Sequence, residues 1–241
     1  MPLHTLKIRF CSELKSLPDG LALLESLEVL EIIYCKKLGS LPEQLGQLKK
    51  LKSLLIRSAS ALYCLPNSLG QLESLEQFRI ERCQKLESLP HSLGQLQKLK
   101  LLTIEGSEDL TYLPDSLGQL KSLQSLTINT CPKLESLPHT LQDLSLLQRL
   151  DIIKCPLLSE KCKREGVDWH KIAHIHEIFI DYYRCLKRTL TAGWFSTAAD
   201  ETGLNSCRIG ILMLFSRTSL EVKLRELAIS FYGVSQSAEC K

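Results

Sequence analysis

The sequence lacks any apolar run long enough to cross a membrane. Its longest apolar stretch runs from Ile209 to Phe215, whereas a membrane-spanning helix needs about 20 such residues. The opening MPLHTLKIRF contains no apolar run of signal-peptide length. None of Asn67, Asn129 and Asn205 lies in an Asn-x-Ser/Thr glycosylation acceptor. These absences predict an intracellular chain without a transmembrane segment.

Signatures of catalysis and of a strongly charged surface are also missing. The sequence contains no G-x-x-x-x-G-K-[ST] phosphate loop, no G-x-S-x-G elbow and no H-E-x-x-H zinc motif. A formal net charge of +3 is too small to require nucleic acid or an anionic membrane as a partner. We therefore expect no enzymatic activity, no cofactor and no nucleic-acid binding.

What the sequence does contain is a leucine period of 24 residues through its first two thirds. Each repeat opens with Leu-x-x-Leu-x-Ile, in which Phe78 once replaces the second leucine, and the first six continue to Leu-x-x-Leu-Pro. Such a period is typical of a solenoid of stacked supersecondary units. The leucines that open the seven repeats are Leu3, Leu27, Leu51, Leu75, Leu99, Leu123 and Leu147.

Within one repeat the pattern predicts two elements on opposite sides. Residues 75–81 alternate apolar and polar positions around Phe78 and Ile80, as a short half-buried strand requires. Pro90 suits the first turn of a helix, where Leu93 and Leu96 can face inward. The expected fold is an α/β solenoid over residues 1–158, with a parallel concave sheet and short helix or 3₁₀ turns on the convex side.

A single repeat cannot bury its apolar side chains alone, so the repeats must stack and their ends need caps. The N-terminal end shows no cap, because Leu3, Leu6 and Ile8 already form a regular repeat strand. We expect that further repeats or another domain precede Met1, or that the chain is a truncated product. At the other end, residues 159–181 predict a capping segment in which Trp169, with Ile172, Ile175 and Ile178, covers the last repeat, while Lys161, Lys163, Arg164 and Lys171 stay in water.

Half of the ten cysteines share one position of the repeat, two residues after the strand. A small residue there fits a narrow buried corner, where a thiol can meet a backbone carbonyl. We expect free core thiols, with a disulfide or redox role as the minor alternative. The five cysteines are Cys11, Cys35, Cys83, Cys131 and Cys155, and Ala59 and Ser107 take the same position in the other two repeats.

Four potential zinc ligands lie near the end of the repeats, at Cys155, Cys162, His170 and His174. Their Cys-x6-Cys and His-x3-His spacings match no strong zinc pattern, and Cys155 already has a place in the core. We therefore predict no metal site.

The repeats match the leucine-rich-repeat consensus, and their subtype is narrower. Units reading L-x-x-L-x-I-x-x-C-x-x-L-x-x-L-P-x-x-L-G-Q-L resemble those of plant intracellular nucleotide-binding leucine-rich-repeat (NLR) disease-resistance proteins of the coiled-coil class. The segment from Cys155-Pro156 to Asp168-Trp169 resembles the closing segment of those proteins, although His176 stands where the family often has proline.

The resemblance implies a recognition region that holds a nucleotide switch off until a pathogen signal is sensed. Its implied partners are a pathogen effector, a guarded host protein, or a nucleotide-binding domain in cis or in trans. The implied location is cytoplasmic, with nuclear entry possible. The alternative is a free-standing intracellular repeat scaffold in signalling. An in-frame phosphate-loop domain upstream of Met1 would favour the receptor over the scaffold.

The outward positions of the concave strands are the candidate binding site. They vary between repeats, whereas the convex consensus is nearly constant, and this contrast suits a recognition surface as well as drift at exposed positions. An apolar group beside charged residues on the first three strands favours recognition. The candidate residues are Lys7, Arg9, Phe10, Glu31, Ile33, Tyr34, Leu55, Arg57, Arg79, Glu81, Arg82, Thr103, Glu105, Asn129, Asp151 and Lys154.

Residues 182–241 do not resemble the family. We expect an atypical tail that is partly helical or disordered, with Thr218 and Glu221 as a possible capping box for an amphipathic helix. Packing on the cap, binding a partner or a membrane surface, and an unusual transcript end without an evolved role all remain open.

Overall fold

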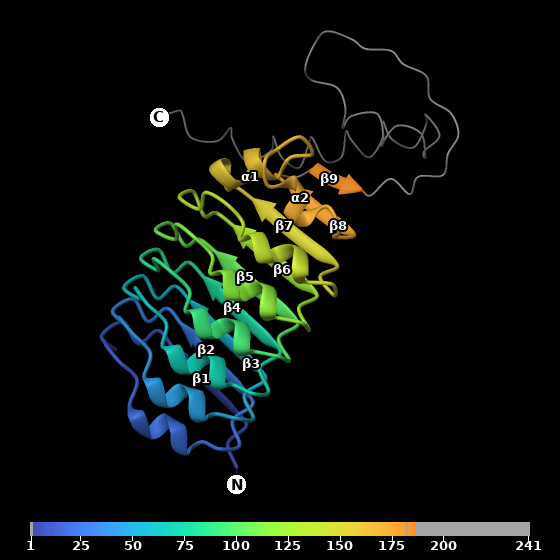
Figure 1. The fold of residues 1–241 in the computed structure, drawn as a ribbon. Helices are drawn as coiled ribbons and strands as arrows, with labels where there is room; N and C mark the ends of the chain where they lie inside the picture. The colour runs from blue at the N-terminus through green and yellow to red at the C-terminus, as the bar shows by residue number, and fades with distance from the viewer. Residues whose placement is uncertain (1, 182, 187–241) are drawn as a thin grey trace, which may run out of the picture. The chain divides into compact units, whose positions relative to one another are not determined.

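A computed structural model describes residues 2–181 and 183–186 of the chain. Nine short strands stack into one sheet in sequence order, and every neighbouring pair from β1 to β8 is parallel (Figure 1). Their bounds are β1 Thr5–Arg9, β2 Val29–Ile33, β3 Ser53–Arg57, β4 Gln77–Glu81, β5 Leu101–Glu105, β6 Ser125–Asn129, β7 Arg149–Ile153, β8 Glu177–Ile180 and β9 Tyr183–Leu186.

The expected leucine-rich-repeat solenoid of seven 24-residue units is confirmed. Each strand residue pairs with the residue 24 positions later, so Leu54 lies beside Phe78 and Ile56 beside Ile80. This register holds in every pair from β1 through β7. Equivalent side chains of successive repeats therefore form straight rows across the sheet.

The convex side is built from 3₁₀ turns, which lie opposite the sheet (Figure 1). A proline in extended conformation precedes each turn, such as Pro66 before η3 and Pro90 before η4. The sequence predicted proline in the first turn of a helix, whereas the structure places it one residue earlier, as the cap residue before the turn. The turns are η1 Asp19–Leu23, η2 Glu43–Gln47, η3 Asn67–Gln71, η4 His91–Gln95, η5 Asp115–Gln119 and η6 His139–Asp143.

Apolar side chains from the strands and the turns meet in one continuous core. The third repeat contributes eight buried residues, and Phe78 of the fourth repeat is fully buried in place of a leucine. Burying an aliphatic side chain stabilises the fold by roughly 1.5–3 kcal/mol. The eight residues are Leu51, Leu54, Ile56, Ala59, Leu62, Leu65, Leu69 and Leu72.

The C-terminal segment covers the last repeat with α1 Pro156–Cys162, α2 Trp169–Ile172 and β8. Ile172, Ile175 and Ile178 are buried in the core, and Trp169 packs against it partly buried. The expectation that Lys171 stays in water is wrong, because only 14% of its side chain is exposed. Its Nζ lies 2.7 Å from the Asp168 carboxylate, which holds it inside the cap.

The strand β9 lies in the segment for which the sequence predicted a helical or disordered tail. It pairs antiparallel with β8, with Ile178 opposite Cys185. The antiparallel strand ends the run of parallel pairs at this edge of the sheet. The predicted capping box at Thr218 and its helix lie outside the described residues.

The other edge of the sheet is formed by β1. Leu3 is 44% exposed, and Leu6 and Ile8 are only partly buried, although their equivalents Leu30 and Ile32 are fully buried. The difference arises because β1 pairs with β2 alone. In the part of the chain that the structure describes, no helix has the length and apolar character needed to cross a membrane.

Candidate functional site

Three rows of side chains carry the predicted site, and each is named here by its residue in the first repeat. The position-7 row runs through Lys7, Glu31, Leu55, Arg79, Thr103, Thr127 and Asp151, and the position-9 row through Arg9, Ile33, Arg57, Glu81, Glu105, Asn129 and Ile153. The position-10 row follows the strands and comprises Phe10, Tyr34, Ser58, Arg82, Gly106, Thr130 and Lys154.

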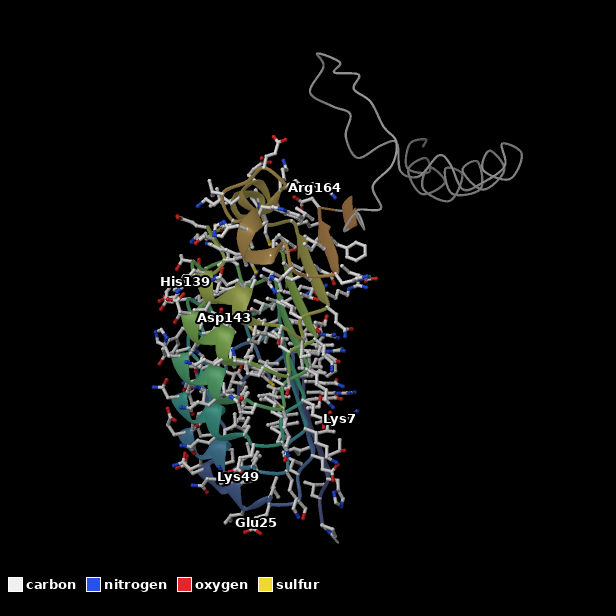
Figure 2. All side chains as sticks on the ribbon, turned by 45° about the vertical axis from the view of Figure 1, so that its right-hand side comes forward. Lys7, Glu25, Lys49, His139, Asp143 and Arg164 are labelled. Carbon is white, nitrogen blue, oxygen red and sulfur yellow. The ribbon has the colours of Figure 1, made fainter. Side chains whose placement is uncertain are left out.

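The pleat of the strands places these rows on the concave face. In β3, Leu54 and Ile56 are fully buried, whereas Leu55 and Arg57 between and after them are half-exposed. Alternate strand residues point to opposite sides of a sheet, so the outward rows meet solvent. Figure 2 shows Lys7 on the sheet side, and Lys49, His139 and Asp143 on the side of the 3₁₀ turns.

The position-10 row has a backbone conformation that the sequence did not reveal. Its members have positive φ in every repeat, from 53° at Lys154 to 65° at Gly106. In the first six repeats the backbone N–H of this residue donates to a carbonyl of the next strand, as when Tyr34 donates to the Arg57 carbonyl at 2.9 Å. This left-handed conformation costs a non-glycine residue roughly 1–2 kcal/mol, yet only Gly106 in this row is glycine.

Two aromatic residues occupy this row at its N-terminal end. The rings of Phe10 and Tyr34 stack with centroids 5.2 Å apart and planes 7° from parallel. Phe10 is 72% exposed and Tyr34 37% exposed. The stack leaves one aromatic face open to solvent beside the first two strands.

Ion pairs on the concave face join β1 to β2 and β3 to β4. Glu31 accepts from Arg9 at 2.6 Å and lies 3.0 Å from Lys7 Nζ. The hydrogen bond from Arg9, with further help from Lys7, lowers the pKa of Glu31. Arg57 Nε donates to Glu81 at 2.5 Å, and this bond raises the pKa of Arg57.

Two predicted binding residues are not exposed. Ile33 is only 9% exposed, and Arg9 and Arg57 are its neighbours in the position-9 row. Asp151 is 7% exposed and accepts hydrogen bonds from Arg149 and Thr127. Both residues lie at outward positions of the concave strands, as predicted, but little of either is exposed to a partner.

Arg79 and Arg82 differ from the other basic residues of this face. Both are exposed, and neither forms an ion pair or side-chain hydrogen bond with any residue that the structure describes. Leu55 and Thr103 lie on either side of Arg79 in its row. The side chains of Arg79 and Arg82 are therefore free to meet a ligand.

A further outward row, which was not among the predicted site residues, lies at the start of each strand and includes Leu101 and Arg149. Arg149 pairs with Asp151 and lies 4.7 Å from the centroid of the Phe179 ring in β8. The alternation of the strands, extended by one step toward the N-terminus, would have located this row.

The in-register cysteines behave as predicted except at the N-terminal end. Cys35, Cys83, Cys131 and Cys155 are buried and not in disulfides, whereas Cys11 is exposed because no repeat covers it in the described part of the chain. The Cys83 thiol donates to the Glu81 carbonyl at 3.8 Å. Burial raises the pKa of Cys83 to about 11, so it is a neutral thiol at physiological pH.

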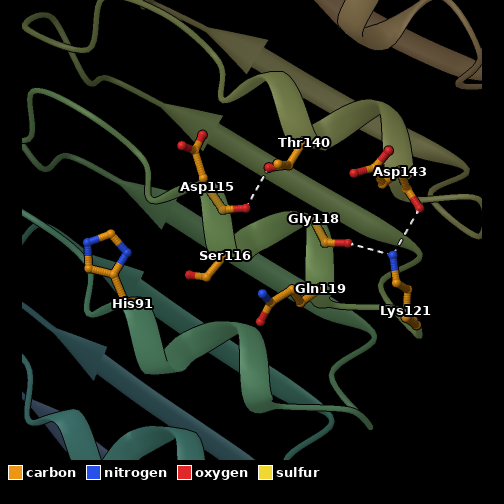
Figure 3. A pocket seen from close by; sticks show the side chains of 8 residues that line it. All are labelled: His91, Asp115, Ser116, Gly118, Gln119, Lys121, Thr140 and Asp143. Atoms are coloured by element: carbon orange, nitrogen blue, oxygen red, sulfur yellow. Dashed lines mark hydrogen bonds between the residues drawn. The ribbon is translucent and has the colours of Figure 1, made fainter.

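Two hollows accompany these surfaces. One of about 520 Å³ lies on the convex side, where Thr140 Oγ donates to the Asp115 carbonyl and Lys121 Nζ to the Gly118 carbonyl (Figure 3). The other, of about 600 Å³, is lined by residues that include Arg149 and Glu177. Among residues 2–181 and 183–186, no three metal-ligating side chains come together.

Comparison with known proteins gives solved structures that are similar to this chain. The leucine-rich repeat domain of the type III effector XopL is 28% identical, with a TM-score of 0.57, and covers 64% of this chain and 53% of that one. A leucine-rich repeat protein of Leptospira interrogans is 26% identical, with a TM-score of 0.46, over 70% of this chain and 46% of its own. This chain therefore spans about half the length of each solved chain. No curated protein sequence matches it.

The family described as leucine-rich repeat region matches residues 59–238. The match covers four of the seven strand-forming repeats, the cap and most of the segment after it. Domains of this kind are generally protein-binding modules. On its repeats, its stacked sheet and this match, the chain belongs to the leucine-rich repeat region family.

Proposed function

We propose that this chain is the recognition region of a plant intracellular immune receptor of the NLR class. In this role it binds a pathogen effector, a guarded host protein or a nucleotide-binding domain. It holds the nucleotide-binding domain inactive until a pathogen signal arrives. The repeat motif with its cysteine and Leu-Pro, and the closing segment from Cys155 to Trp169, support this assignment.

The observation that carries the proposal is the contrast between the two sides of the solenoid. The convex turns repeat Leu-Gly-Gln-Leu at Leu69, Leu93 and Leu117 with little change. The position-7 row instead reads Lys, Glu, Leu, Arg, Thr, Thr and Asp. Packing between repeats restricts the residue types of the convex turns, whereas a surface that recognises one partner needs different side chains from strand to strand.

The proposal includes a binding role without catalysis or a cofactor, in the cytoplasm or the nucleus. The concave face offers charged, aromatic and hydroxyl side chains over a broad surface, which suits contact with a protein. Its charged groups are spread along rows of neighbouring strands, whereas a catalytic site would gather them around one reacting atom.

Co-precipitation with a co-expressed nucleotide-binding domain from the same locus tests the proposal. We expect capture by the unmodified chain and loss of capture by L55Y/T103Y, because two bulky neutral rings would block the centre of the concave face. K50Y/K98Y adds the same rings at two exposed lysines outside the strands and should bind normally. Capture that L55Y/T103Y leaves unchanged contradicts the concave site, and capture of a different signalling protein alone favours a free-standing scaffold.

A further inference from the structure

We propose that the first four strands of the concave face bind an acidic segment of a partner protein that carries an aromatic side chain. This inference rests on the proposed recognition function and names the chemistry of the partner at that site. It further specifies the spacing between the aromatic residue and the carboxylates.

The charges of the three concave rows divide the face into two halves. On β1 to β4 these rows carry five basic residues, Lys7, Arg9, Arg57, Arg79 and Arg82, against the acidic residues Glu31 and Glu81. On β5 to β7 they carry Lys154 against Glu105 and Asp151. The N-terminal half is therefore the one that attracts an acidic partner.

Ion pairing within the described residues leaves Arg79 of β4 and Arg82, which follows β4, available. Glu31 is shared by Lys7 and Arg9, and Glu81 is bonded to Arg57. Arg79 and Arg82 are exposed and have no such carboxylate partner among the described residues. An arginine guanidinium binds a carboxylate through two parallel hydrogen bonds, which gives both strength and direction.

The surroundings of Arg82 keep it accessible. The next residue of its row is Gly106, whose backbone lies so close that a Cβ there would be 3.2 Å from the Cα of Arg82. The preceding residue of the row is Ser58, which is small. A partner can therefore approach Arg82 along the row from either side.

The aromatic stack supplies the apolar contact. Phe10 is 72% exposed. Phe10 and Tyr34 both have positive φ, 58° and 57°, a conformation that is unfavourable for aromatic residues. Three other members of this row are small, namely Ser58, Gly106 and Thr130, and no other member is aromatic. Exposed aromatic rings beside arginine are typical of residues that dominate binding energy at protein interfaces.

The spacing of the strands predicts how far apart the aromatic residue and the carboxylate lie along the partner segment. Tyr34 follows β2 and Arg82 follows β4, two strands later, so their backbones are about 10 Å apart at roughly 4.8 Å per strand. Phe10 follows β1, one strand further. An extended segment advances about 3.3 Å per residue, so the aromatic residue and the carboxylate should be about three to four residues apart.

Selection of phage-displayed random 12-residue peptides on the full chain tests the inference. We expect the enriched peptides to be acidic and to carry an aromatic residue about three or four positions from Asp or Glu. The binding of a fluorescein-labelled enriched peptide should weaken at least about tenfold in R79E/R82E, because each lost bidentate pair becomes a repulsion. Enrichment of basic or uncharged peptides would overturn the inference.

Two further variants complete the experiment. F10G removes one ring of the stack and places there a residue that tolerates positive φ. It should therefore weaken the binding of the same peptide. K50E/K98E reverses two exposed charges outside the strands and should leave the affinity unchanged. Circular dichroism melting of each variant establishes that it is folded.

The variants also separate this inference from the proposed function. Loss of partner binding in L55Y/T103Y, combined with full binding in R79E/R82E, would contradict the acidic segment and leave concave recognition standing. Unchanged binding in both variants would contradict the concave site itself. An affinity that does not fall as salt rises would also contradict the acidic segment, because salt screens exposed charge pairs.

Discussion

At the scale of single residues, the glycines of the Leu-Gly-Gln-Leu motif have a role that their helix propensity conceals. Glycine weakens a helix, and this property alone explains a short turn. The structure adds a steric reason, because a Cβ on Gly70 would lie 2.3 Å from the Ser92 carbonyl of the next turn, and one on Gly94 the same distance from that of Ser116. Close stacking of the turns therefore requires glycine at these positions.

Replacement of Gly70 by alanine should destabilise the protein by about 1–3 kcal/mol, the usual cost of overpacking. Urea unfolding followed by circular dichroism measures the change. The matched control is Gly20→Ala, since a Cβ at Gly20 meets no atom within 4 Å and alanine favours helical turns. Equal stability of the G70A variant and the unmodified protein would show that the turns can move apart at little cost.

At the scale of elements, the cap satisfies backbone groups that another repeat would otherwise cover. Asp168 accepts a hydrogen bond from the Leu137 N–H at 3.1 Å, and Lys171 donates to the Leu137 carbonyl at 2.7 Å. Asp181 likewise accepts from the Lys154 N–H at 2.8 Å. In earlier repeats the equivalent N–H donates to the next strand, as Thr130 does to the Ile153 carbonyl. Side chains of the cap thus take the place of a missing strand.

Replacement of Asp168 by alanine should cost about 3–5 kcal/mol, because it leaves a largely buried Lys171 cation without its partner. The same substitution removes the acceptor for the Leu137 N–H. Chemical unfolding of the full chain gives the free energy. For comparison, Lys163→Ala breaks an exposed ion pair with Glu160 and should cost at most about 1 kcal/mol. Similar losses in the two variants would mean that the buried pair adds no more than a surface pair.

At the scale of the whole described solenoid, each repeat touches only its neighbours, so stability depends on position along the stack. The inner repeats bury their leucines between two others, whereas Leu3 is 44% exposed and β1 pairs on one side. Local opening should therefore begin at the first strand.

Hydrogen exchange measured by mass spectrometry should show this gradient. Amides of β1 should exchange faster than those of β4 and β5 under native conditions, because opening β1 exposes less apolar surface. The internal control is β7, which has the cap on its outer side and should stay protected. Uniform exchange from β1 to β7 would mean that the solenoid opens only as one unit.

The sequence by itself determined the architecture of the repeats. A strict period fixes which leucines meet, and alternation around Leu54 or Phe78 fixes which side chains enter the core. It could also place the concave rows, since equivalent positions of stacked repeats must align. It could not show which members of those rows are available, as Ile33 and Asp151 illustrate.

Only the tertiary structure decided that Arg57 forms an ion pair with Glu81 and that Arg79 forms none with any described residue. The physical reason is that equivalent positions of a regular repeat form the core, and the sequence contains the period of that repeat. Pairing depends on which neighbouring side chains reach one another across strands, and exposure depends on how long side chains lie over them. Both are properties of the assembled surface.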